Sequence, residues 1–202
     1  MANCNGSSVA FKRIMPRSLS LPITDEVIAR LHAGEELLLS GWVLTGRDQS
    51  CARLYGLLQA NESLPVELSD QLMYFVGPSP ARPGSVTGSA GPTTTGRMST
   101  FLPTLLANGI KGFIGKGNLT QDVKDALVRY RGVYLGAIGG TGALLASSID
   151  EVKVLAFEEL LSEAIHAMRF NSFPVVVLHD IYGRDVYVEA LSQNTLETDC
   201  AY

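Results

Sequence analysis

The residues best suited to chemistry lie in a segment rich in glycine, proline and threonine, GPTTTGRM at 91–98. An apolar-periodic run begins at Met98, so we expect this segment to be a loop that leads into a helix N-terminus. Unpaired N–H groups and the helix dipole favour an anion at such a place. If the first turn starts near Thr93, its hydroxyl and the guanidinium of Arg97, four residues later, share one face. The segment therefore predicts a site for a small molecule that carries a carboxylate.

Three further segments follow predicted strands and offer a positive charge or an open backbone. Arg47 and Asp48 come where a buried strand ends, although, taken alone, they are better explained as a surface ion pair or a helix cap. GKGN at 115–118 places Lys116 between glycines that allow a ligand to approach, or it is a turn with an exposed lysine. GGTG at 139–142 fits either a backbone anion cradle or a tightly packed connector. None of these spacings matches a P-loop or a dinucleotide fingerprint.

Taken together, these strand ends indicate more than each does alone. An α/β fold can bring Arg47, Arg97, Lys116 and a threonine hydroxyl to one place. Such a cluster is cationic and has no evident acid catalyst and no cofactor of its own. It therefore corresponds to half of an active site.

The composition indicates a single globular domain. Of 202 residues, 46% are apolar and 18% are charged, which provides ample core. The net charge of -4 argues against nucleic acid, and no apolar run reaches the ~18–20 residues of a membrane helix. The N-terminus lacks the apolar centre of a signal peptide, so we expect a cytoplasmic protein, with an organelle address for the basic residues 1–17 as the alternative.

Three scattered cysteines, Cys4, Cys51 and Cys200, form neither a disulfide framework nor a metal motif. An iron–sulfur cluster ordinarily needs four thiolates, or three with an open iron, so we expect this chain alone to hold no metal. The three histidines, His32, His166 and His179, lie in unrelated contexts and are expected to be structural.

The pattern of apolar residues, caps and breakers predicts a mixed sheet with alternating strands and helices. We expect a loose lead-in over 1–17, a domain over 18–190 and a C-terminal tail over 191–202. Predicted strands are 19–23, 36–45, 72–76, 110–114, 133–138, 152–157 and 165–170, with a hairpin of 175–178 and 186–188. Predicted helices are 24–31, 51–58, 98–107, 120–130 and 143–146, the third shortened or kinked by Pro103 and the first and fourth capped by Thr24 and Thr120.

The ordered combination of GRD at 46–48, GPTTTGRM, GKGN and GGTGALLA at 139–146 resembles the beta subunit of class I (iron–sulfur) fumarases. The same module forms the C-terminal domain of the single-chain enzymes and the beta subunit of L-tartrate dehydratase. The resemblance covers about residues 18–190. It implies an α/β fold, a single three-layer β/β/α swivelling domain with a mixed sheet, and a hydro-lyase reaction between fumarate and L-malate. It also implies an alpha subunit that carries a [4Fe–4S] cluster, in a hetero-oligomer, or a homodimer of the isolated chain.

By the same resemblance, Arg47, Arg97 and Lys116 bind the carboxylates of a small dicarboxylate substrate. Thr93, Arg97 and Lys116 are the catalytic residues, and the hydroxyl of Thr93 is the base for the C3 proton. Asp48, Gly117, Asn118, Gly139 and Gly140 support them, and Asp48 orients Arg47. The acid for the leaving hydroxyl is expected from the alpha subunit.

One departure concerns Cys51, because many relatives carry a histidine three residues after the aspartate of GRD. The absence of that histidine is expected to alter substrate preference. Alternatives to fumarate hydration are dehydration of L-tartrate or another 2-hydroxy diacid, a non-catalytic anion-binding module, and a purely structural assembly subunit.

Overall fold

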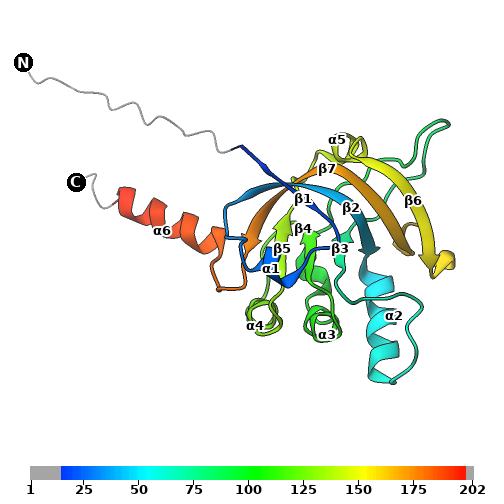
Figure 1. The fold of residues 1–202 in the computed structure, drawn as a ribbon, viewed down its shortest axis with the longest axis horizontal. Coiled ribbons are helices and arrows are strands. Elements are labelled where there is room, and N and C mark those ends of the chain that lie inside the picture. The colour runs from blue at the N-terminus through cyan, green and yellow to red at the C-terminus, as the bar shows by residue number, and fades with distance from the viewer. Residues whose placement is uncertain (1–14, 199–202) are drawn as a thin grey trace, which may run out of the picture.

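The computed structural model describes residues 15–198 (Figure 1). Within that range the strands are β1 Arg17–Ser20, β2 Glu36–Gly46, β3 Leu72–Phe75, β4 Gly112–Gly115, β5 Val133–Gly136, β6 Ile149–Ala156 and β7 Ile165–His179. The α-helices are α1 Asp25–Ile28, α2 Asp48–Gln59, α3 Leu102–Ala107, α4 Gln121–Tyr130, α5 Gly142–Ala146 and α6 Val186–Thr198. Two 3₁₀ segments are η1 Thr95–Met98 and η2 Glu158–Glu163. None of these helices is long and apolar enough to cross a membrane.

The strands form a sheet in the order β1-β2-β3-β4-β5-β7-β6, and β7 also pairs with β2. That extra pairing closes β2, β3, β4, β5 and β7 into a barrel, while β1 and β6 flank it. The first four barrel strands are parallel, and β7 is antiparallel to both β2 and β5. The predicted α/β class with a mixed sheet is therefore confirmed, with the addition that the sheet closes.

Strand β2 is long because it meets three partners along its length. Its first half pairs with β1, its last residues with β3, and residues 36–44 with β7 across an irregularity between Leu39 and Gly41. Gly41 has φ +127°, and a Cβ there would lie 2.8 Å from the Cβ of Leu21. Only glycine tolerates both the backbone angle and that approach, so it marks the point where β2 bends.

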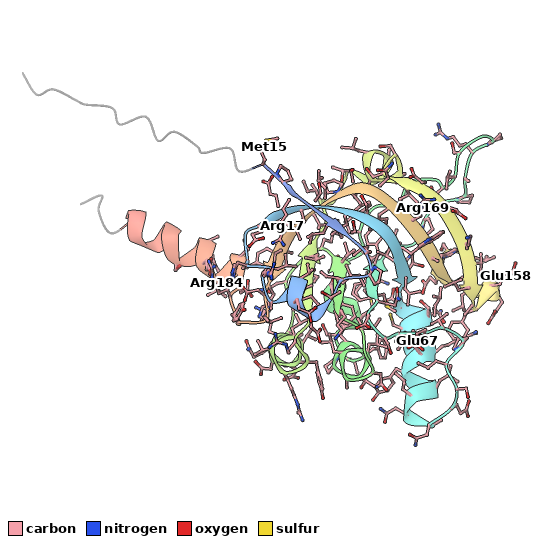
Figure 2. The ribbon with its side chains drawn as sticks, viewed as in Figure 1. Met15, Arg17, Glu67, Glu158, Arg169 and Arg184 are labelled. Carbon is pink, nitrogen blue, oxygen red and sulfur yellow. The ribbon has the colours of Figure 1, made fainter. Side chains whose placement is uncertain are left out.

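Two apolar cores result from the two faces of the sheet, because side chains alternate along each strand. The inner core fills the barrel and includes Leu39, Tyr74, Leu135 and Phe173. The outer core lies between the barrel and α2, α3 and α4, which Figure 1 shows beneath it. Side chains of the barrel strands and of these three helices fill the space between them (Figure 2). The outer core holds the helices against the strands whose ends carry the predicted site.

Most predicted elements are present, with shifted boundaries. Oγ1 of Thr24 accepts the N–H of Val27, which confirms the cap of α1. Thr120 stands at the N-cap of α4, but its side chain makes no capping hydrogen bond. The helix predicted from Cys51 begins at Asp48, and the helix predicted from Met98 begins at Leu102 with Pro103 in its first turn, where the missing N–H costs nothing.

The predicted C-terminal hairpin is wrong. The stretches 165–170 and 175–178 belong to the single strand β7, because different parts of it pair with β6, β2 and β5. The range 186–188 begins helix α6 instead of a strand. Oδ1 of Asp185 accepts the N–H of Tyr187 at 2.8 Å and that of Val188 at 3.4 Å, which caps the helix against the strand preference of these residues. Helix α6 then continues into the predicted tail.

Candidate functional site

Four of the predicted segments lie at one edge of the barrel. Since β2, β3, β4 and β5 are parallel neighbours, their carboxyl ends meet there. Arg47 follows β2, the threonine segment follows β3, Lys116 follows β4, and Gly139 and Gly140 follow β5. The topology thus brings together the loops that the sequence placed after strands.

Backbone hydrogen bonds fix the threonine segment between the ends of β3 and β4. The N–H of Thr93 donates to the carbonyl of Phe75 at 2.7 Å, and the N–H of Lys116 donates to the carbonyl of Thr93 at 3.3 Å. The N–H of Thr95 donates back to the carbonyl of Lys116 at 3.0 Å. Thr93 is half-buried, and no side-chain hydrogen bond occupies its hydroxyl within residues 15–198. That hydroxyl is free to meet a ligand.

The expectation that Thr93 and Arg97 share one helix face is wrong. The helix after the motif is the single 3₁₀ turn η1, and Thr93 precedes its N-cap residue Thr94, which is extended and bridges to Lys116 just after β4. A 3₁₀ turn of four residues carries little of the dipole on which that expectation rested. Arg97, within η1, instead reaches the edge through its long side chain.

Asp48 joins the two arginines. Its Oδ2 lies 2.7 Å from Nη2 of Arg97 and 3.4 Å from Nε of Arg47. The side chain of Arg97 is 51% exposed, that of Arg47 is 27% exposed and that of Asp48 is 31% exposed. Two guanidinium groups are thereby held beside one carboxylate, with remaining N–H donors that can face a dicarboxylate.

Glu163, at the end of η2, is a member of this group that the sequence did not indicate. Its Oε1 lies 3.7 Å from Nε of Arg47, and its Oε2 accepts the N–H of Gln49 at 2.8 Å. The edge therefore contains two carboxylates among its cations. The sequence offered no signal for this contact, because η2 is far from GRD along the chain.

Lys116 supplies a charge without a carboxylate partner among the described residues. It is half-buried beside Gly139, where an added Cβ would lie 3.3 Å from Cδ and 3.6 Å from Nζ of the lysine. Gly139 therefore gives the lysine stem its space. Gly140 has φ +82°, and a Cβ added there would meet nothing within 4 Å, so this side of its backbone is open.

A buried tyrosine supports the loop after β4. The hydroxyl of Tyr134 lies 2.9 Å from both the carbonyl of Gly117 and Oγ1 of Thr95. Because a carbonyl only accepts, Tyr134 donates to Gly117 and accepts from Thr95. Burial raises the pKa of Tyr134 well above its usual range, so it stays protonated. Gly117 itself has φ +81°, and Oδ1 of Asn118 accepts the N–H of Leu119 at 2.8 Å, which shapes the same turn.

The residues described do not fit an iron–sulfur cluster. Cys51 is fully buried in the outer core, and burial raises the pKa of its thiol far above the usual range, so it remains neutral. No group of three or more potential ligands gathers anywhere in residues 15–198. Cys4 and Cys200 lie outside the described residues.

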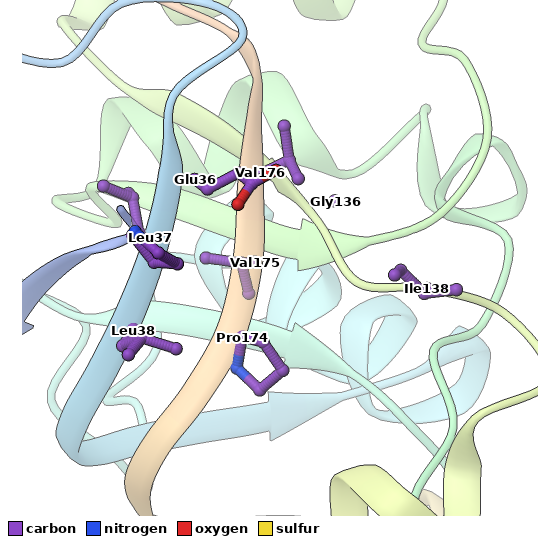
Figure 3. A pocket seen from close by; sticks show the side chains of 9 residues that line it. Glu36, Leu37, Leu38, Gly136, Ile138, Pro174, Val175 and Val176 are labelled. Atoms are coloured by element: carbon purple, nitrogen blue, oxygen red, sulfur yellow. The ribbon is translucent and has the colours of Figure 1, made fainter. Parts of the chain in front are cut away.

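A separate apolar pocket of about 180 Å³ lies on the outside of β2 and β7 (Figure 3). It is lined by Pro16, Glu36, Leu37, Leu38, Gly136, Ile138, Pro174, Val175 and Val176. Glu36 is its one charged lining residue, so it does not suit a dicarboxylate. The strand-end edge that carries Arg47, Arg97 and Lys116, called the cationic edge below, remains the candidate site.

The chain is therefore an α/β protein built on a closed barrel, with Arg47, Arg97 and Lys116 gathered at the ends of its parallel strands. The model of the family described as Fumarase C-terminus matches residues 7–190, and the chain belongs to this family.

Curated relatives include both longer enzymes and a subunit of similar size. The chain is 36% identical over 173 residues to "Fumarate hydratase class I, anaerobic" of Escherichia coli, covering 83% of this chain and 32% of that protein. It is 34% identical over 167 residues to "Fumarate hydratase 2" of Leishmania major, covering 82% and 29%. It is 32% identical over 173 residues to "Putative L(+)-tartrate dehydratase subunit beta" of Methanocaldococcus jannaschii, covering 83% and 89%. The chain thus spans about a third of the fumarate hydratases it matches.

Proposed function

We propose that this chain is the beta subunit of an iron–sulfur hydro-lyase that interconverts fumarate and L-malate. The observation that carries the proposal is the link from Arg47 through Asp48 to Arg97, at the strand-end edge that also holds Lys116. Two arginines held side by side suit the two carboxylates of a C4 diacid.

In this proposal Arg47 and Arg97 bind the substrate carboxylates and Lys116 adds a further positive charge. These cations would also stabilise the negative charge that develops when the C3 proton leaves. The hydroxyl of Thr93 handles that proton, and its lack of a hydrogen-bond partner in the described chain supports this role. A threonine base needs activation, which the neighbouring cations can provide.

The proposed partner is an alpha subunit that carries the [4Fe–4S] cluster and the acid for the leaving hydroxyl. Support comes from the name of the tartrate dehydratase relative, which is a beta subunit. The closed barrel with α2, α3 and α4 beneath it would correspond to the β/β/α swivelling domain, in a hetero-oligomer in the cytoplasm.

The second candidate is dehydration of L-tartrate or another 2-hydroxy diacid. It is favoured by one observation, since the tartrate dehydratase subunit is matched over 89% of its length. Both reactions use the same carboxylate contacts, so a substrate panel on the assembled complex decides between them. Preference for tartrate would reverse our order.

The test is anaerobic reconstitution with the cognate alpha chain, followed by fumarate hydration assays. Thr93→Val removes the hydroxyl and Thr93→Ser keeps it, while exposed Thr94→Val is the matched control. We expect the first variant to lose at least about a hundredfold in kcat, consistent with general base catalysis, and the other two to retain activity. Arg97→Ala and Lys116→Ala should also reduce kcat/KM.

Rival functions predict different results in the same experiment. If Thr93→Val, Arg97→Ala and Lys116→Ala all stayed within about threefold, or ~0.65 kcal/mol of barrier, the site would be wrong. A structural assembly subunit predicts normal turnover but loss of complex formation in these variants. A non-catalytic anion-binding module predicts no activity when the alpha chain is added.

A further inference from the structure

The carboxylate of Glu163 connects η2 to the beginning of α2. Its side chain is 20% exposed, and its two oxygens are divided between the backbone of Gln49 and the guanidinium of Arg47. Figure 2 labels Glu158, the first residue of η2, beyond the end of β6. The segment thus reaches the strand-end edge from the flanking sheet.

The contact with Glu163 supplies a hydrogen-bond acceptor that the N-cap residue of α2 lacks. Arg47 occupies the N-cap position, and a guanidinium has no acceptor with which to cap a helix. The first N–H groups of a helix need acceptors from elsewhere. Ser50 Oγ accepts the N–H of Arg47 at 2.9 Å, and Glu163 accepts that of Gln49. An acidic cap also suits the positive end of the helix dipole.

The backbone at Gly77 also lies close to the Arg47 guanidinium. A Cβ at Gly77, just after β3, would collide with Nη1 of Arg47. The closest atom of Arg47 to both Asp48 and Glu163 is Nε. The guanidinium is therefore restricted by two carboxylates near Nε and by the backbone of Gly77 near Nη1.

The segment that carries Glu163 is itself held in place at several points. Arg53 of α2 forms an ion pair with Glu159 of η2. Just after η2, the hydroxyl oxygen of Thr45 accepts the N–H of His166 at 2.9 Å, which joins the ends of β2 and β7. Glu163 is thus presented from a fixed backbone.

We propose that Glu163 is a positioning residue that orients Arg47 for bidentate contact with a substrate carboxylate. The inference rests on the proposed function, in which Arg47 binds substrate. Bidentate recognition depends on the plane of the guanidinium, and small misplacements of a binding group have large kinetic costs.

The first experiment compares Glu163→Gln with Glu159→Gln in the reconstituted complex. Both changes neutralise one carboxylate of η2, but only Glu163 contacts Arg47. We expect Glu163→Gln to raise KM for the diacid about tenfold while Glu159→Gln changes it little. The glutamine oxygen can still accept the N–H of Gln49, so the thermal unfolding temperature should move by only a few degrees. Loss of folding in Glu163→Gln, or equal effects of the two variants, would make Glu163 structural and overturn the inference.

A double-mutant cycle with Arg47→Lys tests the route of the effect. If Glu163 acts through Arg47, Glu163→Gln should change kcat/KM by less than about twofold in the Arg47→Lys background. An undiminished tenfold effect in that background would contradict the inference. A wild-type complex inactive on every diacid tested would instead refute the proposed function, and it would do so before any variant was measured.

Discussion

Nη2 of Arg97 lies 2.7 Å from Oδ2 of Asp48, although Arg97 belongs to η1 and Asp48 begins α2. The same carboxylate oxygen is 3.4 Å from Nε of Arg47. The two guanidinium groups carry like charges that repel each other, and the shared carboxylate offsets that repulsion. Asp48 thus allows two arginines to occupy one edge before any ligand arrives.

Asp48→Asn is expected to separate the two arginines and to lower kcat/KM of the reconstituted complex by about tenfold or more. Stability should fall by at most about 1 kcal/mol, because these ion pairs are partly exposed. Asp25→Asn is a matched control, since Asp25 also begins a helix and pairs with a lysine, Lys111, at 2.7 Å. Steady-state kinetics and urea unfolding measure both effects. A large loss in the control would mean that charge at a helix start, rather than the arginine link, matters.

Tyr134→Phe should destabilise the chain by about 1–3 kcal/mol, because the partly buried carbonyl of Gly117 and the buried hydroxyl of Thr95 both lose a partner. For a domain of this size that corresponds to a fall in Tm of roughly 2–12 °C. Tyr130→Phe is the control, since Tyr130 on α4 makes no side-chain hydrogen bond within residues 15–198. Calorimetry of the isolated chain measures the difference, and equal Tm values for the two variants would refute the network.

Leu161→Gly should stabilise the chain. Leu161 has φ 55° and ψ −115°, a conformation that favours glycine, and its side chain is 77% exposed. Relief of strain worth about 1–3 kcal/mol exceeds the ~0.5–1 kcal/mol of added chain entropy, so a net gain of about 1 kcal/mol is expected. Exposed Ser162→Gly, which has no such strain to relieve, should be neutral or destabilising. Urea unfolding checks both signs.

Stability should fall as the pH is lowered from 7.5 to 5.5. Burial lowers the pKa of His166 and, against the influence of Asp185, that of His179. The unfolded chain, with histidine pKa values near ~6.5, therefore binds more protons than the folded chain, and acid favours unfolding. Each histidine contributes a slope of at most about 1.4 kcal/mol per pH unit. Urea titrations of the wild type and of His166→Asn with His179→Asn measure it, and a flat wild-type profile would contradict the expectation.

The sequence was sufficient to predict the cationic edge, and the reason is local. Arg47, Lys116 and Gly139 each follow an apolar run that the periodicity identifies as a strand, and parallel strands share an edge. Their roles in catalysis stay predictions, and the assays above test them. The helix face expected for Thr93 and Arg97 failed because Pro92 and Thr94 on either side of Thr93 form β-bridges, which leaves one 3₁₀ turn at the end of the segment.

Contacts between distant segments were not predictable from local patterns. Glu163 and Tyr134 join the site through tertiary packing, and no spacing in the sequence links them to GRD or GKGN. Closure of the barrel likewise depends on the pairing of β7 with both β2 and β5, which no local pattern indicates. Tyr187 and Val188 are residue types that favour strands, but the hydrogen bonds from their N–H groups to Asp185 cap a helix there.

Because β7 closes the ring by pairing with both β2 and β5, the protein cannot complete its barrel during translation until residues near 179 have left the ribosome. Until then, the nascent chain carries two unpaired strand edges with apolar side chains between them. Pairing over such sequence separation is slow. A message truncated before residue 165 would therefore yield a product prone to aggregation and dependent on chaperones.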